Sequence, residues 1–270
     1  MLKQFICCAF LVISAGCSLN FLNELSDKNT DDAVIYDAKV AVNEQNYDYA
    51  IELLTQRLSA SGQTKTEARE TLASAYAGKC GLNFLSFVDG LANAVSGSAF
   101  QLVSSPFVGV DVNADYCLDS LQTLDLIGPT ETRTTDQNAF ASIVGMVLMG
   151  ASTRAYTDNN PVGGDGAQDA ADISCSLTDA QIDNIILGYG YMAKNFSALS
   201  TSQIGSSSST TISDSINTCT SVAGSSCEIT DPADITNGIR DVMKDLLNTT
   251  QYGVGTQDGS NPALIPAACP

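Results

Sequence analysis

The sequence predicts an all-α protein of about eight helices, and three observations lead to this fold class. Apolar residues recur three or four positions apart through most of the chain after residue 30. Helix-capping residues stand in front of several of these periodic runs. Strand-like alternation of apolar and polar residues is not sustained anywhere. The clearest periodic run extends from residue 182 to 196, with one apolar face formed by Ile182, Ile185, Ile186, Tyr189, Met192, Ala193 and Phe196.

The first helices are expected between residues 31 and 80. Thr30 can cap a helix whose first turn carries Asp31 and Asp32, which suit the positive end of the helix dipole. The segment NEQNYDYA then predicts a tight turn into a second helix, with its apolar spacing centred on Ala50. A polar stretch follows, and ARETLASAYAGKCG predicts a third helix.

The first two of these helices, with Ala50 in NYDYAIELL, resemble a tetratricopeptide repeat. The segment ETLASAYAG in the third helix resembles the start of a second repeat. The positions Ala41 and Tyr76 correspond at a spacing of 35 residues, close to the repeat length of about 34. An ordinary helical hairpin would give the same periodicity. The resemblance covers residues 31–95 and implies stacked hairpins with a concave surface for partners. We expect these hairpins to continue into an irregular, disulfide-stapled helical bundle over residues 96–270.

The later elements follow from the same signals. The segment from Leu82 to Leu91 is strongly apolar, and predicts a core helix or, less favoured, a surface that docks lipid or a partner. A helix is expected over 114–126. The next, over 138–156, is apolar on all sides and rich in small residues, which is typical of the centre of a bundle, and Thr135 or Asp136 should cap it.

Three features are expected in the last third of the chain. Thr178 and Gln181 form a capping box for the helix that follows. Residues 200–215, rich in serine and threonine, predict an exposed loop. Asp231 and Pro232 predict the start of a final helix, whose buried stripe is Ile235, Ile239, Val242 and Leu246.

The N-terminus carries a second resemblance. Lys3 precedes an apolar run from Phe5 to Ile13, which is too short to span a bilayer and has the proportions of a signal peptide. The small residues directly before Cys17 resemble the lipobox of bacterial lipoproteins, while a plain signal peptide is the alternative. The resemblance implies cleavage after residue 16, a fatty-acyl (palmitate-type) lipid on Cys17, a tether over 17–30, and anchoring in the outer membrane facing the periplasm or cell surface.

The cysteine count agrees with export. Removing Cys7 and Cys8 with the signal, and assigning Cys17 to the lipid, leaves an even number, which predicts three disulfides in an oxidising compartment. The six are Cys80, Cys117, Cys175, Cys219, Cys227 and Cys269. The sequence leaves their pairing open, although Cys219 and Cys227 are the favoured local pair because a short polar turn separates them.

The composition of the chain excludes several classes of function. The formal charge is −18, which argues against nucleic-acid binding. The chain contains no histidine, so Ser-His-Asp and Cys-His catalysis and histidine-bearing metal sites are excluded. Zinc is not expected. One acidic segment, residues 158–172, offers hard oxygen ligands suited to calcium, although an acidic loop that binds no ion is the favoured interpretation. Its candidate ligands are Asp158, Asn160, Asp165, Asp169 and Asp172.

These observations predict a non-catalytic lipoprotein, without a cofactor, that binds a protein partner of unknown identity through its tetratricopeptide-like helices as a scaffold or adaptor. The runner-up is an accessory component of a solute-uptake system that binds a small ligand between its helices. A hydrolase built on paired carboxylates is a third hypothesis.

Overall fold

A computed structural model describes residues 29–93, 97–108, 110, 112–159, 168–170, 173–261, 263, 265 and 269. Over these residues the predicted all-α fold is confirmed, with one isolated bridge between Thr249 and Gln257 and no strand. Eleven α-helices occur in the described part of the chain, against the eight or so expected. They are α2 (Asp31–Asn43), α3 (Tyr47–Glu52), α4 (Thr66–Cys80), α5 (Phe84–Ala92), α6 (Ala99–Ser104), α7 (Ala114–Asp125), α8 (Thr135–Thr157), α9 (Asp179–Asn195), α10 (Thr201–Ile204), α11 (Ser206–Ala223) and α12 (Asn237–Leu247).

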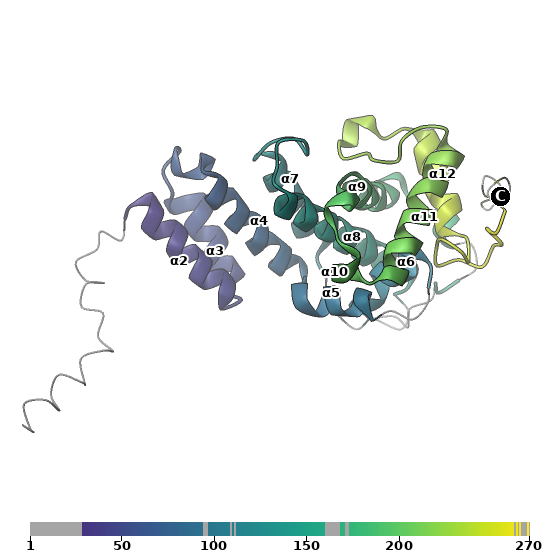
Figure 1. Cartoon of the computed structure of the whole chain (residues 1–270), viewed down its shortest axis with the longest axis horizontal. Helices are drawn as coiled ribbons and strands as arrows, with labels where there is room; N and C mark the ends of the chain where they lie inside the picture. The colour runs from purple at the N-terminus through teal and green to yellow at the C-terminus, as the bar shows by residue number, and fades with distance from the viewer. Residues whose placement is uncertain are drawn as a thin grey trace, which may run out of the picture.

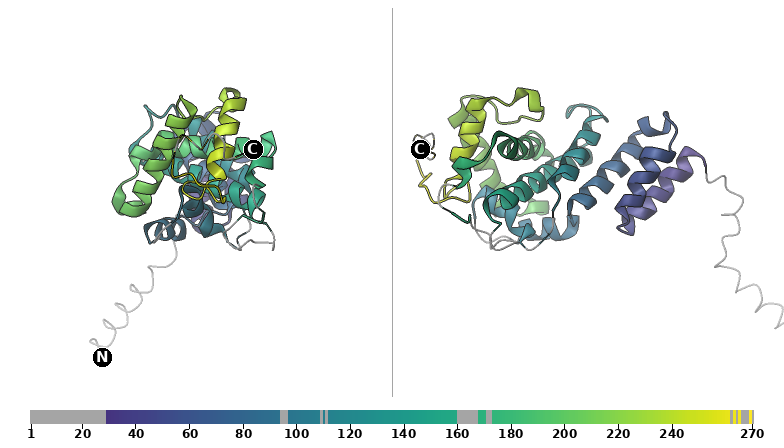
Figure 2. Two further views of the ribbon diagram at one scale, coloured as in Figure 1. Left: turned by 90° about the vertical axis from the view of Figure 1, so that its right-hand side faces the viewer. Right: turned by 180° about the vertical axis from the view of Figure 1, so that it is seen from behind.

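The N-terminal and C-terminal helices lie at opposite ends of the long axis of the molecule. Helices α2, α3 and α4 lie side by side at one end, and α11 and α12 lie at the other (Figure 1; Figure 2). Helices α7, α8 and α9 stand between these two groups. The arrangement places the N-terminal helices in a layered stack and the later helices in a bundle.

The first hairpin consists of α2 and α3. The hydroxyl of Thr30 accepts a hydrogen bond from the backbone N–H of Ala33, so the predicted cap is confirmed. Helix α2 ends in a turn in which the N–H groups of Gln45 and Asn46 donate to the carbonyls of Val42 and Ala41. After α3 the chain makes one π-helical turn, Leu53–Arg57.

Helix α4 pairs with α7 and not with the helix that follows it directly. The two run antiparallel, because the Cys80–Cys117 disulfide joins the end of α4 to the start of α7, and Arg69 near the start of α4 donates to the carbonyl of Leu126 after α7. The Ser120 hydroxyl donates to the Ala73 carbonyl at 2.7 Å in the buried interface. Residues 81–113 are therefore an insertion in this hairpin, and they carry α5 and α6.

Helices α8 and α9 form the centre of the bundle. Helix α8 is the one described helix long and apolar enough to cross a membrane, but 83% of its most apolar window is buried inside the fold. Its predicted position in the core is therefore confirmed. It packs against α6, α7 and α9. Its cap is Thr134, one residue before the predicted Thr135, and Gln137 completes the capping box.

Glycines allow the central helices to approach closely. A Cβ on Gly145 of α8 would lie 2.6 Å from the backbone nitrogen of Met192 in α9, and one on Gly188 would lie 2.5 Å from that of Met149. The capping box at Thr178 is confirmed, and so is the burial of the α9 face from Ile182 to Ala193.

Two predictions for the last third of the chain are wrong. Residues 200–215 form α10 and most of α11 instead of an exposed loop, because their serines bond inside the fold. The Ser208 hydroxyl donates to the Leu91 carbonyl at 2.7 Å, and Ser215 pairs with the Tyr189 hydroxyl at 3.1 Å. Asp231 caps only a short 3-10 turn, Pro232–Asp234. Helix α12 begins five residues after Pro232, and Thr236 caps it.

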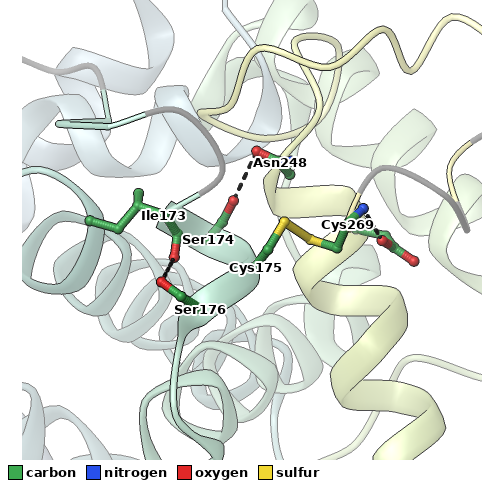
Figure 3. Close-up of a disulfide and its surroundings, with 7 residues drawn as sticks. Ile173, Ser174, Cys175, Ser176, Asn248 and Cys269 are labelled. Carbon is green, nitrogen blue, oxygen red and sulfur yellow. Dashed lines mark hydrogen bonds between the residues drawn. A yellow bond between two sulfur atoms is a disulfide. The ribbon is translucent and has the colours of Figure 1, made fainter.

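Three disulfides staple the described fold: Cys80–Cys117, Cys175–Cys269 and Cys219–Cys227. Figure 3 shows that Cys175, in the 3-10 turn Ile173–Ser176, meets Cys269 near the end of the chain. Beside this bridge the Ser174 hydroxyl donates to Asn248 at 3.1 Å, and the Cys269 N–H donates to Asp245 at 2.8 Å. Cys269 is thus held to the bundle by a disulfide and by a hydrogen bond.

Candidate functional site

A groove of about 580 Å³ opens where the first hairpin meets the insertion. Its walls come from α2, α4, α8, the starts of α3 and α5, and the turn between α4 and α5. The first helix of each of the three hairpins (α2 of α2/α3, α4 of α4/α7 and α8 of α8/α9) therefore contributes to one surface. The lining residues are Val42, Asn43, Gln45, Tyr47, Ser74, Ala77, Gly78, Gly81, Leu82, Asn83, Phe84, Leu85 and Phe140.

Small residues allow the helices beside this groove to pack closely. Ala41, Ala50 and Ala75 form a buried cluster that brings α2, α3 and α4 together. The ring of Tyr47 packs against Gly78 so closely that a Cβ at this position would clash with the ring. Tyr47 therefore forms the part of the groove wall that lies against α4.

Another part of the wall is the turn from Gly81 to Asn83. Gly81 ends α4 with a φ of 109°, a left-handed conformation that glycine adopts readily. The side chain of Asn83 then caps α5 by accepting from the backbone N–H of Ser86 at 3.1 Å. The neighbouring Cys80–Cys117 bridge anchors this turn to α7.

The lining of the groove contains no charged residue among the described residues that form it, although the whole chain carries 30 acidic and 12 basic side chains. Phe84 is 42% exposed and Leu85 is 79% exposed at the rim. The amides of Asn43 and Gln45 supply hydrogen-bonding groups. Exposed apolar side chains around an uncharged hollow are typical of the core of a protein–protein interface.

A second hollow, which we call the polar cavity, has a volume of about 510 Å³ and lies between the ends of α7 and α9. Its lining mixes both signs of charge with neutral and apolar groups. The residues are Leu118, Gln122, Asp125, Gly128, Pro129, Thr130, Arg133, Tyr191, Lys194, Thr230, Asp231 and Pro232.

The buried guanidinium of Arg133 organises one wall of the polar cavity. It donates to Asp125 at 3.1 Å, to Thr130 at 2.9 Å, to Asn138 at 3.0 Å and to Asn195 at 3.2 Å. These partners come from α7, the loop after it, α8 and α9. The network therefore locks four segments together, and it leaves the cavity wall with little freedom to rearrange.

Tyr191 completes this wall by donating its hydroxyl hydrogen to the second carboxylate oxygen of Asp125. Burial raises the pKa of Tyr191 far above its usual value, and the hydrogen bond and negative charge of Asp125 add to this effect. The tyrosine is therefore neutral at physiological pH, and it acts as a hydrogen-bonding group, not as a base.

The predicted site residues fall into three groups. Cys17, the predicted lipidation site, lies outside the described residues. The six remaining cysteines come together as three pairs, and the pair favoured from the sequence, Cys219 with Cys227, is among them. Neither the groove nor the polar cavity contains any of the predicted calcium ligands.

The structure describes only two of the calcium candidates. Asp158 is 5% exposed and pairs with Arg154 at 2.8 Å, while Asp169 accepts from the backbone N–H of Asn159 at 2.8 Å. Asn160, Asp165 and Asp172 lie outside the described residues. No group of three potential metal ligands occurs in the described part of the chain.

Sequence reasoning missed the polar cavity and singled out only part of the groove. The apolar segment from Leu82 to Leu91 gave a usable signal, since it allowed either a core helix or a docking surface. The structure places part of this segment in the core, with Phe87 and Leu91 buried, and leaves Leu85 exposed. No local pattern marks Arg133, because its partners are spread from residue 125 to 195.

Comparison with known proteins provides no relative: no family model, no curated protein and no solved structure matches this chain.

Proposed function

We infer that this chain is a non-catalytic, lipid-anchored scaffold or adaptor of the cell envelope, which binds a protein partner in the groove beside α2 and α4. The observation that carries this proposal is the uncharged groove itself, with Phe84 and Leu85 exposed at its rim on a protein whose formal charge is −18. Charged residues are depleted at the centre of protein interfaces, and aromatic residues are enriched there.

The arrangement of the hairpins supports the same function. The first helices of three successive hairpins share the groove, as expected if tetratricopeptide-like hairpins stack with a concave inner surface. The amides of Asn43 and Gln45 can bond to the backbone of a bound segment, while Phe84 and Leu85 contact its apolar side chains. We therefore expect the partner to insert a short, apolar segment of its chain.

The envelope location rests on the sequence and on the disulfides. The Cys17 segment resembles a lipobox, and three disulfides join the other six cysteines. Disulfides persist in oxidising compartments such as the periplasm. A lipid on Cys17 would hold the hairpins near the membrane, since α2 begins only 14 residues after this cysteine.

A pull-down from native membranes tests the groove. Leu85→Asp should remove the specific partner, because it places a charge at the exposed apolar rim. Leu126→Asp is the matched control, since Leu126 is also an exposed leucine, at 64%, but lies after α7 and does not line the groove. Both substitutions are at the surface and should change stability by no more than about 0.5 kcal/mol.

We expect the partner to be lost with Leu85→Asp and kept with Leu126→Asp. If the wild type and both variants recover the same proteins, the groove does not bind them. The runner-up function, binding of a small solute, has its own structural support in the polar cavity.

A further inference from the structure

We propose that the polar cavity is a binding site for a small zwitterion of the α-amino-acid class, with Lys194 binding its carboxylate and Asp231 its ammonium group. This site is separate from the groove. Its volume of about 510 Å³ falls within the range of about 300–1,000 Å³ that is usual for small-molecule pockets.

Lys194 is exceptional among the cations of this chain. The described residues include ten lysines and arginines, and seven of them form ion pairs with acidic side chains. Arg69 donates instead to a backbone carbonyl. Only Lys194 and Lys244 form neither kind of contact in the described part of the chain, and Lys194 lines the polar cavity. Acids outnumber bases by 30 to 12 in the sequence, so an unpaired lysine here is available to a ligand.

Asp231 offers the complementary charge. One of its oxygens accepts from the backbone N–H of Ala233 at 2.8 Å, which fixes the carboxylate at the rim of the cavity. Its negative charge is close enough to Tyr191 to raise the pKa of that hydroxyl, although less than burial and Asp125 do. Asp231 and Tyr191 line the same cavity, and Lys194 lies one helical turn after Tyr191 in α9.

The balance of charges selects the ligand class. Asp125 and Arg133 neutralise each other through their ion pair, which leaves Lys194 and Asp231 as one positive and one negative group. A dianion would be repelled by Asp231 and a dication by Lys194. A neutral ligand would displace water from Lys194 and Asp231 without supplying an opposite charge to either, which costs free energy. A zwitterion satisfies both, and Leu118 can contact its side chain.

The wall is organised before any ligand arrives. Arg133 holds Asp125, Thr130 and Asn195 through hydrogen bonds of 2.9–3.2 Å, and Asp125 in turn holds the Tyr191 hydroxyl. Binding to such a site orders few side chains, which favours affinity for a small molecule.

The test uses the mature, disulfide-bonded chain purified in detergent. Each of the twenty free L-amino acids is screened by thermal melting, and those that raise the melting temperature are measured by titration calorimetry. Acetate and ethylamine serve as single-charge probes, and glucose as a neutral one. We expect at least one amino acid to bind, and acetate, ethylamine and glucose to bind at least tenfold more weakly.

Three variants locate the binding. Lys194→Met keeps the apolar stem and removes the charge, so the affinity should fall at least tenfold. Asp231→Asn should do the same while keeping the cap, because asparagine caps as well as aspartate. Lys244→Met, at the other lysine without an ion pair, should bind like the wild type.

The proposal is overturned if no amino acid binds, if acetate or glucose binds as tightly as the amino acid, or if both cavity variants retain wild-type affinity. Loss of partner pull-down with Leu85→Asp does not bear on this result, because Leu85 lines the groove and not the polar cavity.

Discussion

Replacing Gly188 by alanine should destabilise the protein, although alanine is the better helix former. Gly188 lies where α9 crosses α8, opposite Gly145. A Cβ at this position would lie 2.5 Å from the backbone nitrogen of Met149 and 2.8 Å from the carbonyl oxygen of Gly145. Both neighbours are backbone atoms inside a long helix, so no side-chain rotation can relieve the contact.

The magnitude follows from two opposing effects. The added Cβ would lie 2.5 Å from the Met149 nitrogen, and ordinary van der Waals contact begins at 3.4 Å, so the two helices would have to separate by about 0.9 Å. Overpacking of this kind costs about 1–3 kcal/mol. Alanine in a helix interior regains up to about 1 kcal/mol over glycine. Since the clash involves backbone alone, we expect the cost near the top of its range and a net loss of about 1–2 kcal/mol.

Urea unfolding followed by far-UV circular dichroism measures this change, with the disulfides kept oxidised. Gly90→Ala is the control, because Gly90 also lies inside a helix, α5, but its nearest neighbour is Pro106 at an ordinary 3.9 Å. This variant should gain up to about 1 kcal/mol. A Gly188→Ala protein as stable as the wild type, alongside the expected gain for Gly90→Ala, would refute the close packing of α8 on α9.

Three further predictions concern other parts of the molecule. Gln45 has a φ of 61° after α2, so Gln45→Gly should raise the free energy of unfolding by about 1 kcal/mol, measured by urea unfolding, and no gain would contradict a left-handed residue there. Burial, followed by the negative charge of Asp115, raises the pKa of Asp119. The folded state therefore holds this proton more tightly than the unfolded state does. The stability of the wild type relative to Asp119→Asn should fall as the pH rises from the unfolded-state pKa of about 3.9 through the raised folded-state pKa. Melting temperatures of the two proteins at several pH values test this, and a constant difference would contradict it. Cys17→Ser should abolish labelling of the protein by a radioactive fatty acid in cells, and labelling that survives would exclude lipidation at Cys17.

Local signals predicted the helices well, since capping depends on residues close together in the sequence. Thr30 and Thr178 begin helices as predicted, and the periodicity of α9 identifies its buried face. Composition predicts a loop for the serine-rich stretch, because it does not reveal the buried partners of the serine hydroxyls. Ser208 and Ser215 are buried on one face of α11, where Leu91 and Tyr189 satisfy their hydroxyls.

Features that depend on contacts between distant segments could not be predicted from the sequence. Helix α4 finds its partner in α7, beyond the 81–113 insertion, and no local pattern indicates this. The polar cavity depends on Arg133 meeting Asn195, which lies 62 residues further along the chain. The groove was partly visible as the apolar segment from Leu82 to Leu91, but only the fold separates its buried residues from Leu85 at the rim.

Site-specific photo-crosslinking in living cells tests the proposed partner binding most directly. A photoreactive phenylalanine analogue replaces Leu85 at the rim of the groove in one strain and Leu126, which is exposed outside it, in another. Partner binding in the groove predicts a discrete crosslinked protein from position 85 that is absent from position 126. The absence of any crosslinked protein from position 85, or the same product from both positions, would contradict it.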